Sequence, residues 1–292
     1  MNTRLVFVHG RAQEHKDAIA LKKEWVGAFE EGLAKSNLGF PVPESSVLFP
    51  YYGQTLYDLV NDANSIADVI IRGTRDDAER RFQREVLAEV QRTLGISDSE
   101  VQELLGGDIQ ERGPLNWAWT QGILKAIDRH VPGGSATSIA VATRDVYQYL
   151  RNPGIRDQIE KGVRKALSSE APTVVVSHSL GTVVAYNLLR REGESQGWNV
   201  PLFVTLGSPL AVTAIKASLA PIEHPACVAK WFNAMDERDV VALYPLIKNN
   251  FDIDPEIENK TDVRNKTANR HGIAGYLDDK TVAARIYEAL SR

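Results

Sequence analysis

The sequence is poor in cysteine and methionine and has no long apolar run. The single cysteine, Cys227, cannot close an intramolecular disulfide, which is typical of a protein from a reducing compartment. No apolar stretch is long enough to cross a bilayer. The first ten residues lack the apolar length and the small-residue cleavage site of a secretory signal. We therefore expect a cytoplasmic protein without a transmembrane segment.

Several signals of bound groups are also missing. No two histidines lie at metal-ligand spacing, and no glycine-rich phosphate loop, internal repeat or low-complexity tract is present. The net charge of -4 over 292 residues gives no reason to expect nucleic acid as a partner. The sequence therefore predicts no metal and no other cofactor, in a chain of ordinary globular composition.

What the sequence does contain is an alternation of strand-like and helix-like segments. Strands are predicted at residues 4–8, 47–53, 173–176, 201–209 and 228–233. Helices are predicted at residues 17–35, 154–167, 180–189 and 281–290. Such alternation predicts an α/β fold: a three-layer α/β/α sandwich around a mostly parallel sheet of about six strands, with its ligand site at the carboxyl ends of the strands.

Residues 55–150 interrupt this alternation and contain no convincing strand. Ala78, Phe82, Val86 and Val90 recur every four residues among charges, which predicts an amphipathic helix with one solvated face. Pro114 is predicted to open a further helix that stops at residues 132–134. We interpret residues 1–292 as one domain with a helical insertion, which acts either as a lid over the strand ends or as a surface for a protein partner.

The arginines of the insertion alternate with acids. They are predicted to form a solvated face with i,i+4 pairs rather than to recruit a phosphate. This set comprises the residues Arg72, Arg75, Arg80, Arg81 and Arg84.

Ser179 lies on a sharp turn between a buried strand and a helix. Two positions before and after it, Ser177 and Gly181 are small enough for strand and helix to pass closely. Such a turn exposes the serine hydroxyl at the end of the sheet. It also directs the amide of Leu180, at a helix N-terminus, toward the place where an oxyanion would form.

This stretch resembles the Gly-x-Ser-x-Gly nucleophile elbow of the α/β-hydrolase family, with Ser177 at the first glycine position. The resemblance covers residues 1–54 and 151–292, leaves the insertion unmatched, and implies a hydrolase fold that lacks its first two strands. It also implies a Ser-acid-His triad in that chain order. A serine hydroxyl is a weak nucleophile and needs a base, which the acid orients.

The acid and the base are expected in the last third of the chain. Residues 231–242 resemble the acid loop of lipase-like members of the family, which implies Asp239 as the triad acid. Asp236, closer to the strand end, is the alternative acid. Among the six histidines, His271 alone follows both acids and lies in a loop flanked by glycine, so it is the candidate base.

A second oxyanion donor is implied by the turn after the first predicted strand. His9 and Gly10 resemble the His-Gly turn of many lipases and esterases, with Gly10 shaping the turn and the amide of Arg11 joining that of Leu180 as a donor. Tyr52, after the second strand, and His178, in the elbow, are the candidate substrate-binding residues.

Together these residues predict a serine hydrolase that cleaves carboxylic esters through an acyl-enzyme, with a small-molecule or lipid ester as substrate. Two alternatives remain open. An acyltransferase or thioesterase would use the same residues, and an interaction protein without catalysis would use the charged insertion as its binding surface. The sequence carries no signal for the natural substrate or the oligomeric state.

Overall fold

The computed structural model describes residues 3–10, 17–52, 76–106, 117–133, 135–167 and 170–292. Its centre is a sheet of six parallel strands in the order β2-β1-β3-β4-β5-β6. The strands are β1 (Arg4–Val8), β2 (Val47–Leu48), β3 (Thr173–His178), β4 (Phe203–Leu206), β5 (Trp231–Ala234) and β6 (Glu258–Lys260). Because the strand order reverses between β1 and β3, the crevice for a ligand is expected at their carboxyl ends.

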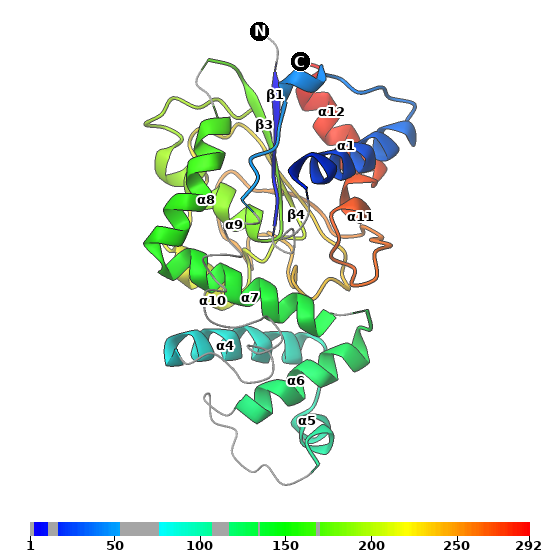
Figure 1. Cartoon of the computed structure of the whole chain (residues 1–292), viewed down its shortest axis with the longest axis vertical. Helices are drawn as coiled ribbons and strands as arrows, with labels where there is room; N and C mark the ends of the chain where they lie inside the picture. Colours follow the sequence, from blue (N-terminus) through cyan, green and yellow to red (C-terminus); the bar gives the residue numbers. More distant parts are fainter. Residues whose placement is uncertain (1–2, 11–16, 53–75, 107–116, 134, 168–169) are drawn as a thin grey trace.

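Helices cover both faces of this sheet (Figure 1). On one face lie α1 (Ala18–Ala34), α11 (Ala274–Leu277) and α12 (Lys280–Leu290), and on the other lie α8 (Pro153–Ala166), α9 (Leu180–Glu192) and α10 (Thr213–Leu219). The fold is therefore α/β with helix layers on either side of a parallel sheet, as the alternation predicted.

The period of two along the strands distributes the core between these faces. In β1, Leu5 and Phe7 join the hydrophobic cluster beneath α1 and α12, whereas Val6 and Val8 join the cluster beneath α9. All four side chains are fully buried. A strand that is apolar on both faces is what a covered parallel sheet requires.

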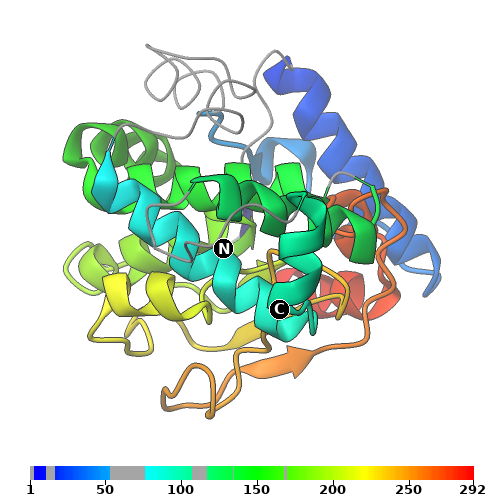
Figure 2. The ribbon, with the colours of Figure 1, turned by 90° about the horizontal axis from the view of Figure 1, so that it is seen from below.

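Four helices of the insertion form a separate layer, which we call the cap. They are α4 (Asp77–Thr93), α5 (Asp98–Leu104), α6 (Trp117–His130) and α7 (Ser135–Arg151). The cap lies beyond the carboxyl ends of the strands (Figure 1) and crosses in front of the sheet when seen from that end (Figure 2). The helix α4 begins where the Asp76 side chain accepts a hydrogen bond from the amide of Ala78, which satisfies one of the free amides of the first turn.

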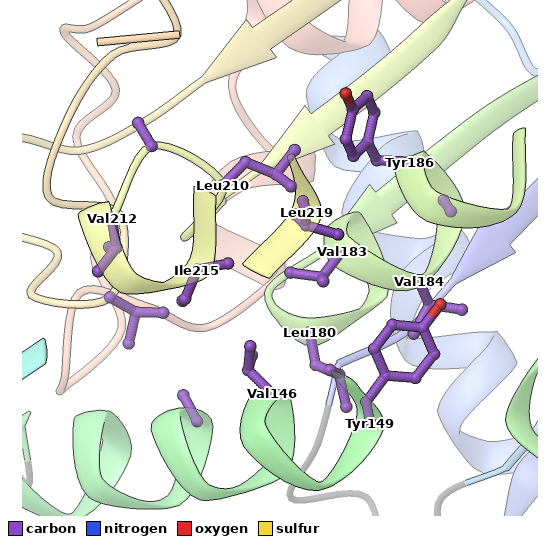
Figure 3. Close-up of a cluster of buried hydrophobic side chains, with 14 of the residues drawn as sticks. Val146, Tyr149, Leu180, Val183, Val184, Tyr186, Leu210, Val212, Ile215 and Leu219 are labelled. Atoms are coloured by element: carbon purple, nitrogen blue, oxygen red, sulfur yellow. The ribbon is translucent and has the colours of Figure 1, made fainter. Parts of the chain in front are cut away.

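The innermost cap helix, α7, packs directly on the elbow helix. Val146 and Tyr149 of α7 point toward Leu180 and Val184 of α9 (Figure 3). These side chains belong to one continuous hydrophobic cluster that also takes in Trp119 of α6. The cap and the sheet layer are therefore joined by a shared core.

The predicted strands are confirmed in position, although most are shorter than expected. The helices expected around residues 17–35, 154–167, 180–189 and 281–290 are confirmed, as is the amphipathic helix through Phe82. The sequence did not predict β6 or α7, and the helix start expected at Pro114 lies outside the described residues. Within the described part of the chain, no helix combines the length and apolar character that crossing a membrane requires.

Candidate active site

Ser179 occupies the tight turn between β3 and α9. Its backbone angles, φ 55° and ψ -128°, lie in a region that side-chain-bearing residues rarely adopt. The turn is so tight that a side chain on Gly181 would collide with the carbonyl oxygens of Val8 and His9. At the other small position, the Ser177 hydroxyl donates to the carbonyl of Val204 at 2.8 Å, so a serine fits there with its polar group satisfied.

The three predicted triad residues are in hydrogen-bond contact. The Nε2 of His271 lies 2.8 Å from Ser179 Oγ, and its Nδ1 lies 2.7 Å from Asp239 Oδ2. An ionised carboxylate only accepts hydrogen bonds, so Nδ1 carries the proton and Nε2 presents its lone pair to the serine hydroxyl. The side chains are held where a hydroxyl, a base and an orienting acid must be for proton transfer.

The Asp239 carboxylate accepts hydrogen bonds at both of its oxygens. Its Oδ1 accepts from the amides of Val241 and Ala242, at 2.9 and 3.4 Å. Its Oδ2 accepts from His271 and also from the phenol of Tyr276, at 2.6 Å. Burial, reinforced by the charge of Asp239, raises the pKa of Tyr276 well above its ordinary value, so the phenol remains a donor. Tyr276 is a site residue that the sequence did not suggest.

Asp236, the alternative acid, faces elsewhere. Its Oδ1 accepts from the Arg238 backbone amide and guanidinium, and its Oδ2 accepts from the same guanidinium and from the amide of Asn265. The Tyr276 hydroxyl accepts from its amide. Asp236 therefore ties the end of β5 to the segment that leads to His271. Of the two acids, the structure puts only Asp239 in contact with the histidine.

His178 lies behind the base. Its Nε2 donates to the carbonyl of His271 at 2.7 Å, and the two rings are 4.7 Å apart. Burial is the main cause that lowers the pKa of His178 from 6.5 to about 3, helped by the nearby His271 ring. The neutral ring therefore positions the backbone of His271. The sequence assigned His178 to the substrate, but its hydrogen bond goes to protein.

The turn after β1 is built around a second buried histidine. The Nδ1 of His9 donates to the Gly10 carbonyl at 2.6 Å, its Nε2 accepts from the Tyr52 amide at 3.1 Å, and its own carbonyl accepts from the Tyr52 hydroxyl. The rings of His9 and Tyr52 stack at 4.0 Å. Burial lowers the pKa of His9 to about 4, against the opposing effect of its bond to Gly10. Tyr52, the other predicted substrate residue, is thus buried against this turn.

Gly10 brings the turn against the nucleophile. A Cβ at Gly10 would lie 2.7 Å from Ser179 Cβ and 3.3 Å from Ser179 Oγ. Arg11, whose amide was predicted as the second oxyanion donor, lies outside the described residues. The first predicted donor, the amide of Leu180, is the first of α9, so no carbonyl within that helix accepts from it.

Gly207, at the end of β4, gives room to the acid and the base. Its φ is 55°, and a Cβ there would lie 3.2 Å from both Asp239 Oδ2 and His271 Nδ1. Gly207 falls inside the strand predicted at residues 201–209, and no site role was predicted for it. The hydroxyl of the neighbouring Ser208 bonds to the hydroxyl of Thr182 and accepts from the amide of Leu210.

The cap touches the segment that carries the base. The side-chain amide of Asn269 joins the two. Its Nδ2 donates to Ser138 Oγ of α7 at 2.8 Å, and its Oδ1 accepts from the backbone amide of His271 at 3.1 Å. Nearby, Gly133 of the cap has a φ of 110° and lies so close to the Ala268 carbonyl that no side chain would fit. The cap therefore reaches His271 through one intervening side chain. Ser179 is only 5% exposed and His271 only 9% exposed.

Comparison of the chain with protein-family models, curated proteins and solved structures gives no match. Interpretation of the site therefore rests on its own geometry. In the described residues, no three metal-ligating side chains converge.

Proposed function

We propose that the protein is a serine hydrolase of the α/β-hydrolase type that cleaves carboxylic esters. The observation that carries the proposal is the continuous hydrogen-bond chain from Ser179 through His271 to Asp239. Each member comes from a different segment, at or after the carboxyl end of a strand. Such an arrangement costs strained backbone at Ser179 and the burial of an acid, so we expect it to serve chemistry.

The strand order supports the family assignment. The nucleophile strand β3 lies between β1, which leads to the His9-Gly10 turn, and β4, and the acid follows β5. This is the order that the resemblance implies when the first two strands of a full-size hydrolase are absent. The acid and histidine also follow the serine in the expected sequence.

In the proposed reaction, Ser179 Oγ attacks the ester carbonyl carbon and gives its proton to His271 Nε2. Asp239 holds the ring and stabilises the imidazolium that forms. The carbonyl oxygen, now negative, is stabilised by the amide of Leu180, and the predicted second donor is the amide of Arg11. His271 then protonates the leaving alkoxide, which breaks the C–O bond and leaves an acyl group on Ser179.

Water completes the cycle. His271, again neutral, removes a proton from a water molecule as its oxygen attacks the acyl carbon, and the bond to Ser179 breaks as the proton returns to the serine oxygen. The carboxylic acid leaves and the enzyme is regenerated. An alcohol or thiol in place of water would make the same residues an acyltransferase, so product analysis with added alcohol separates the two activities.

We further propose that the cap controls access to Ser179. Its helices lie beyond the strand ends, and the low exposure of Ser179 and His271 fits a covered site. Because cap side chains share a core with α9, deleting residues 55–150 would expose that core. Point substitutions on the cap are the better test.

Labelling with a fluorophosphonate probe tests the proposed chemistry. The probe should modify the wild-type protein at Ser179, and Ser179→Ala should abolish labelling. Ser208→Ala is the matched control, because this buried serine bonds to Thr182 and not to a histidine, and its variant should label normally. Hydrolysis of short p-nitrophenyl esters should be lost in Ser179→Ala and His271→Ala. Persistent hydrolysis by purified Ser179→Ala protein would refute the proposal.

A further inference from the structure

A cavity with a volume of about 530 Å³ lies at the side of the cap, between α4 and α10. The two helices contact one another and run side by side in the view from the cap (Figure 2). The side of α4 that lines the cavity carries three arginines, Arg81, Arg84 and Arg92. Their spacing of three and eight residues places them on one helix face.

The three arginines of the cavity form no close ion pair with any described residue, although Arg80 on the same helix pairs with Asp77. The sequence predicted i,i+4 pairs on this face, but no ion pair joins Arg81 to Glu85. The predicted pairing was therefore wrong for Arg81, although its side chain is solvent-exposed as predicted.

Arg84 is the most unusual of the three. Its Nη1 is buried and has no hydrogen-bond partner, while its guanidinium lies over the ring of Trp119 at 5.6 Å. Partial burial lowers the pKa of Arg84, partly offset by Asp98, yet an arginine stays charged at neutral pH. The Arg84 side chain also lines the cavity, so an anion bound there meets its positive charge.

Two acids, Glu85 and Glu89, line the cavity as well, so one formal positive charge is left over from its three arginines. Glu89 is hydrogen-bonded to the start of α10: its Oε1 accepts from the Thr213 hydroxyl at 2.9 Å and its Oε2 accepts from the Thr213 amide at 3.1 Å. Glu85 is exposed on the rim. The remaining lining is small, from Ala88, Ala214 and Ala217, so space is left in front of the guanidinium groups.

We propose that this cavity binds a phosphate group, on a free phosphorylated molecule or on a lipid headgroup. Several guanidinium groups on one side match the several acceptor oxygens of a phosphate, which can receive forked hydrogen bonds from each. The proposed site does not depend on ester hydrolysis. It predicts that the protein binds phosphate whether or not Ser179 is intact.

Calorimetric titration of Ser179→Ala protein with inorganic phosphate tests the site directly. Arg92→Gln and Arg84→Gln should each weaken binding about tenfold, since each removes charged hydrogen bonds. Arg92 is exposed, so its variant will fold even if loss of the Arg84 contact with Trp119 disturbs the cap. Glu85→Gln should strengthen binding. Arg129→Gln, an exposed arginine of α6 outside the cavity, should bind as the parent does.

Vesicle flotation distinguishes the two sources of phosphate. Selective binding to phosphatidylcholine vesicles that contain phosphatidic acid, lost in Arg92→Gln, would identify a lipid headgroup. Phosphate binding without such selectivity would identify a free phosphorylated molecule. The proposal is overturned if neither probe binds, or if Arg129→Gln weakens binding as much as Arg92→Gln. Fluorophosphonate labelling of Ser179 is a separate readout, so either proposal can fail alone.

Discussion

The sheet layer and the cap hold the candidate site in different ways. Around Asp239 and His271, the sheet side supplies hydrogen bonds from fixed groups: two backbone amides, a buried phenol and the ring of His178. The cap reaches the same histidine through Asn269, which bonds to Ser138. In the proposed mechanism, the sheet layer fixes the geometry of proton transfer, and the cap has the separate role of controlling access of substrate to Ser179.

The largest expected effect separates the two buried acids of the sheet layer. Asp239→Asn should lower kcat for ester hydrolysis by about 10³–10⁴-fold, because an amide at this position no longer favours the required tautomer of His271. Asp236→Asn should mainly lower the free energy of unfolding, since it weakens the bonds to Arg238 and Asn265. Steady-state kinetics and urea unfolding of both variants measure the contrast. A larger loss of kcat in Asp236→Asn would contradict it.

The next effect tests how closely the β1 turn must approach the nucleophile. Gly10→Ala should lower kcat by about 10²–10³-fold, because its Cβ pushes the proposed oxyanion turn away from Ser179. The control is Gly39→Ala, where a Cβ meets nothing within 4 Å. Unchanged kinetics in Gly10→Ala would show that the turn takes no part in the reaction.

A smaller effect concerns the two buried histidines of the sheet layer. Burial lowers the pKa of His9 to about 4 and that of His178 to about 3 in the folded protein. As the pH falls below 6.5, both histidines therefore become protonated in the unfolded chain while they are still neutral in the folded protein. Above pH 6.5 both states hold these histidines neutral, so the free energy of unfolding does not depend on their protonation. It should fall by up to about 1.4 kcal/mol per pH unit for each histidine as the pH drops toward its folded pKa.

Urea unfolding between pH 7 and 5 measures this slope, at pH values chosen to limit protonation of carboxylates. His178→Phe removes one of the two rings, so its slope should be shallower by the contribution of one proton. A slope as steep as that of the wild type would mean that His178 takes up a proton without unfolding.

The smallest expected effect comes from the cap. Ser138→Ala removes the cap's hydrogen bond to Asn269 and should change kcat/KM by about 2–10-fold, the range for a single hydrogen bond. If the cap governs access, the change should appear in KM with kcat nearly constant. A loss of kcat in Ser138→Ala as large as that in Gly10→Ala would break the distinction between the two layers.

The sequence predicted the parts of the site that depend on local pattern. The strand-turn-helix around Ser179 is encoded within a few residues. Asp239, with Asp236 as the alternative, followed from the resemblance to the acid loop of lipase-like proteins, and His271 followed from its place after both acids. Tyr276 and Gly207 could not be predicted, because their importance arises only when the segments after β4, β5 and β6 meet around Asp239.

The missed elements have physical reasons as well. The strand β6 is three residues long and largely polar, so it shows no apolar alternation and is defined by pairing with β5. The predicted i,i+4 pairing of Arg81 was also wrong, because spacing along a helix gives proximity and does not decide which way a long side chain turns. Arg72 and Arg75 of the same predicted face lie outside the described residues.

The neutral ring of His178 has one more consequence, which concerns where a proton can go. Two imidazoles lie in one buried site with their centres 4.7 Å apart, and two bases of equal strength would compete for the proton released by Ser179. Because its pKa is near 3, His178 does not accept that proton at neutral pH. In the proposed mechanism, the proton from Ser179 therefore goes to His271 alone, and His178 stays neutral beside the imidazolium.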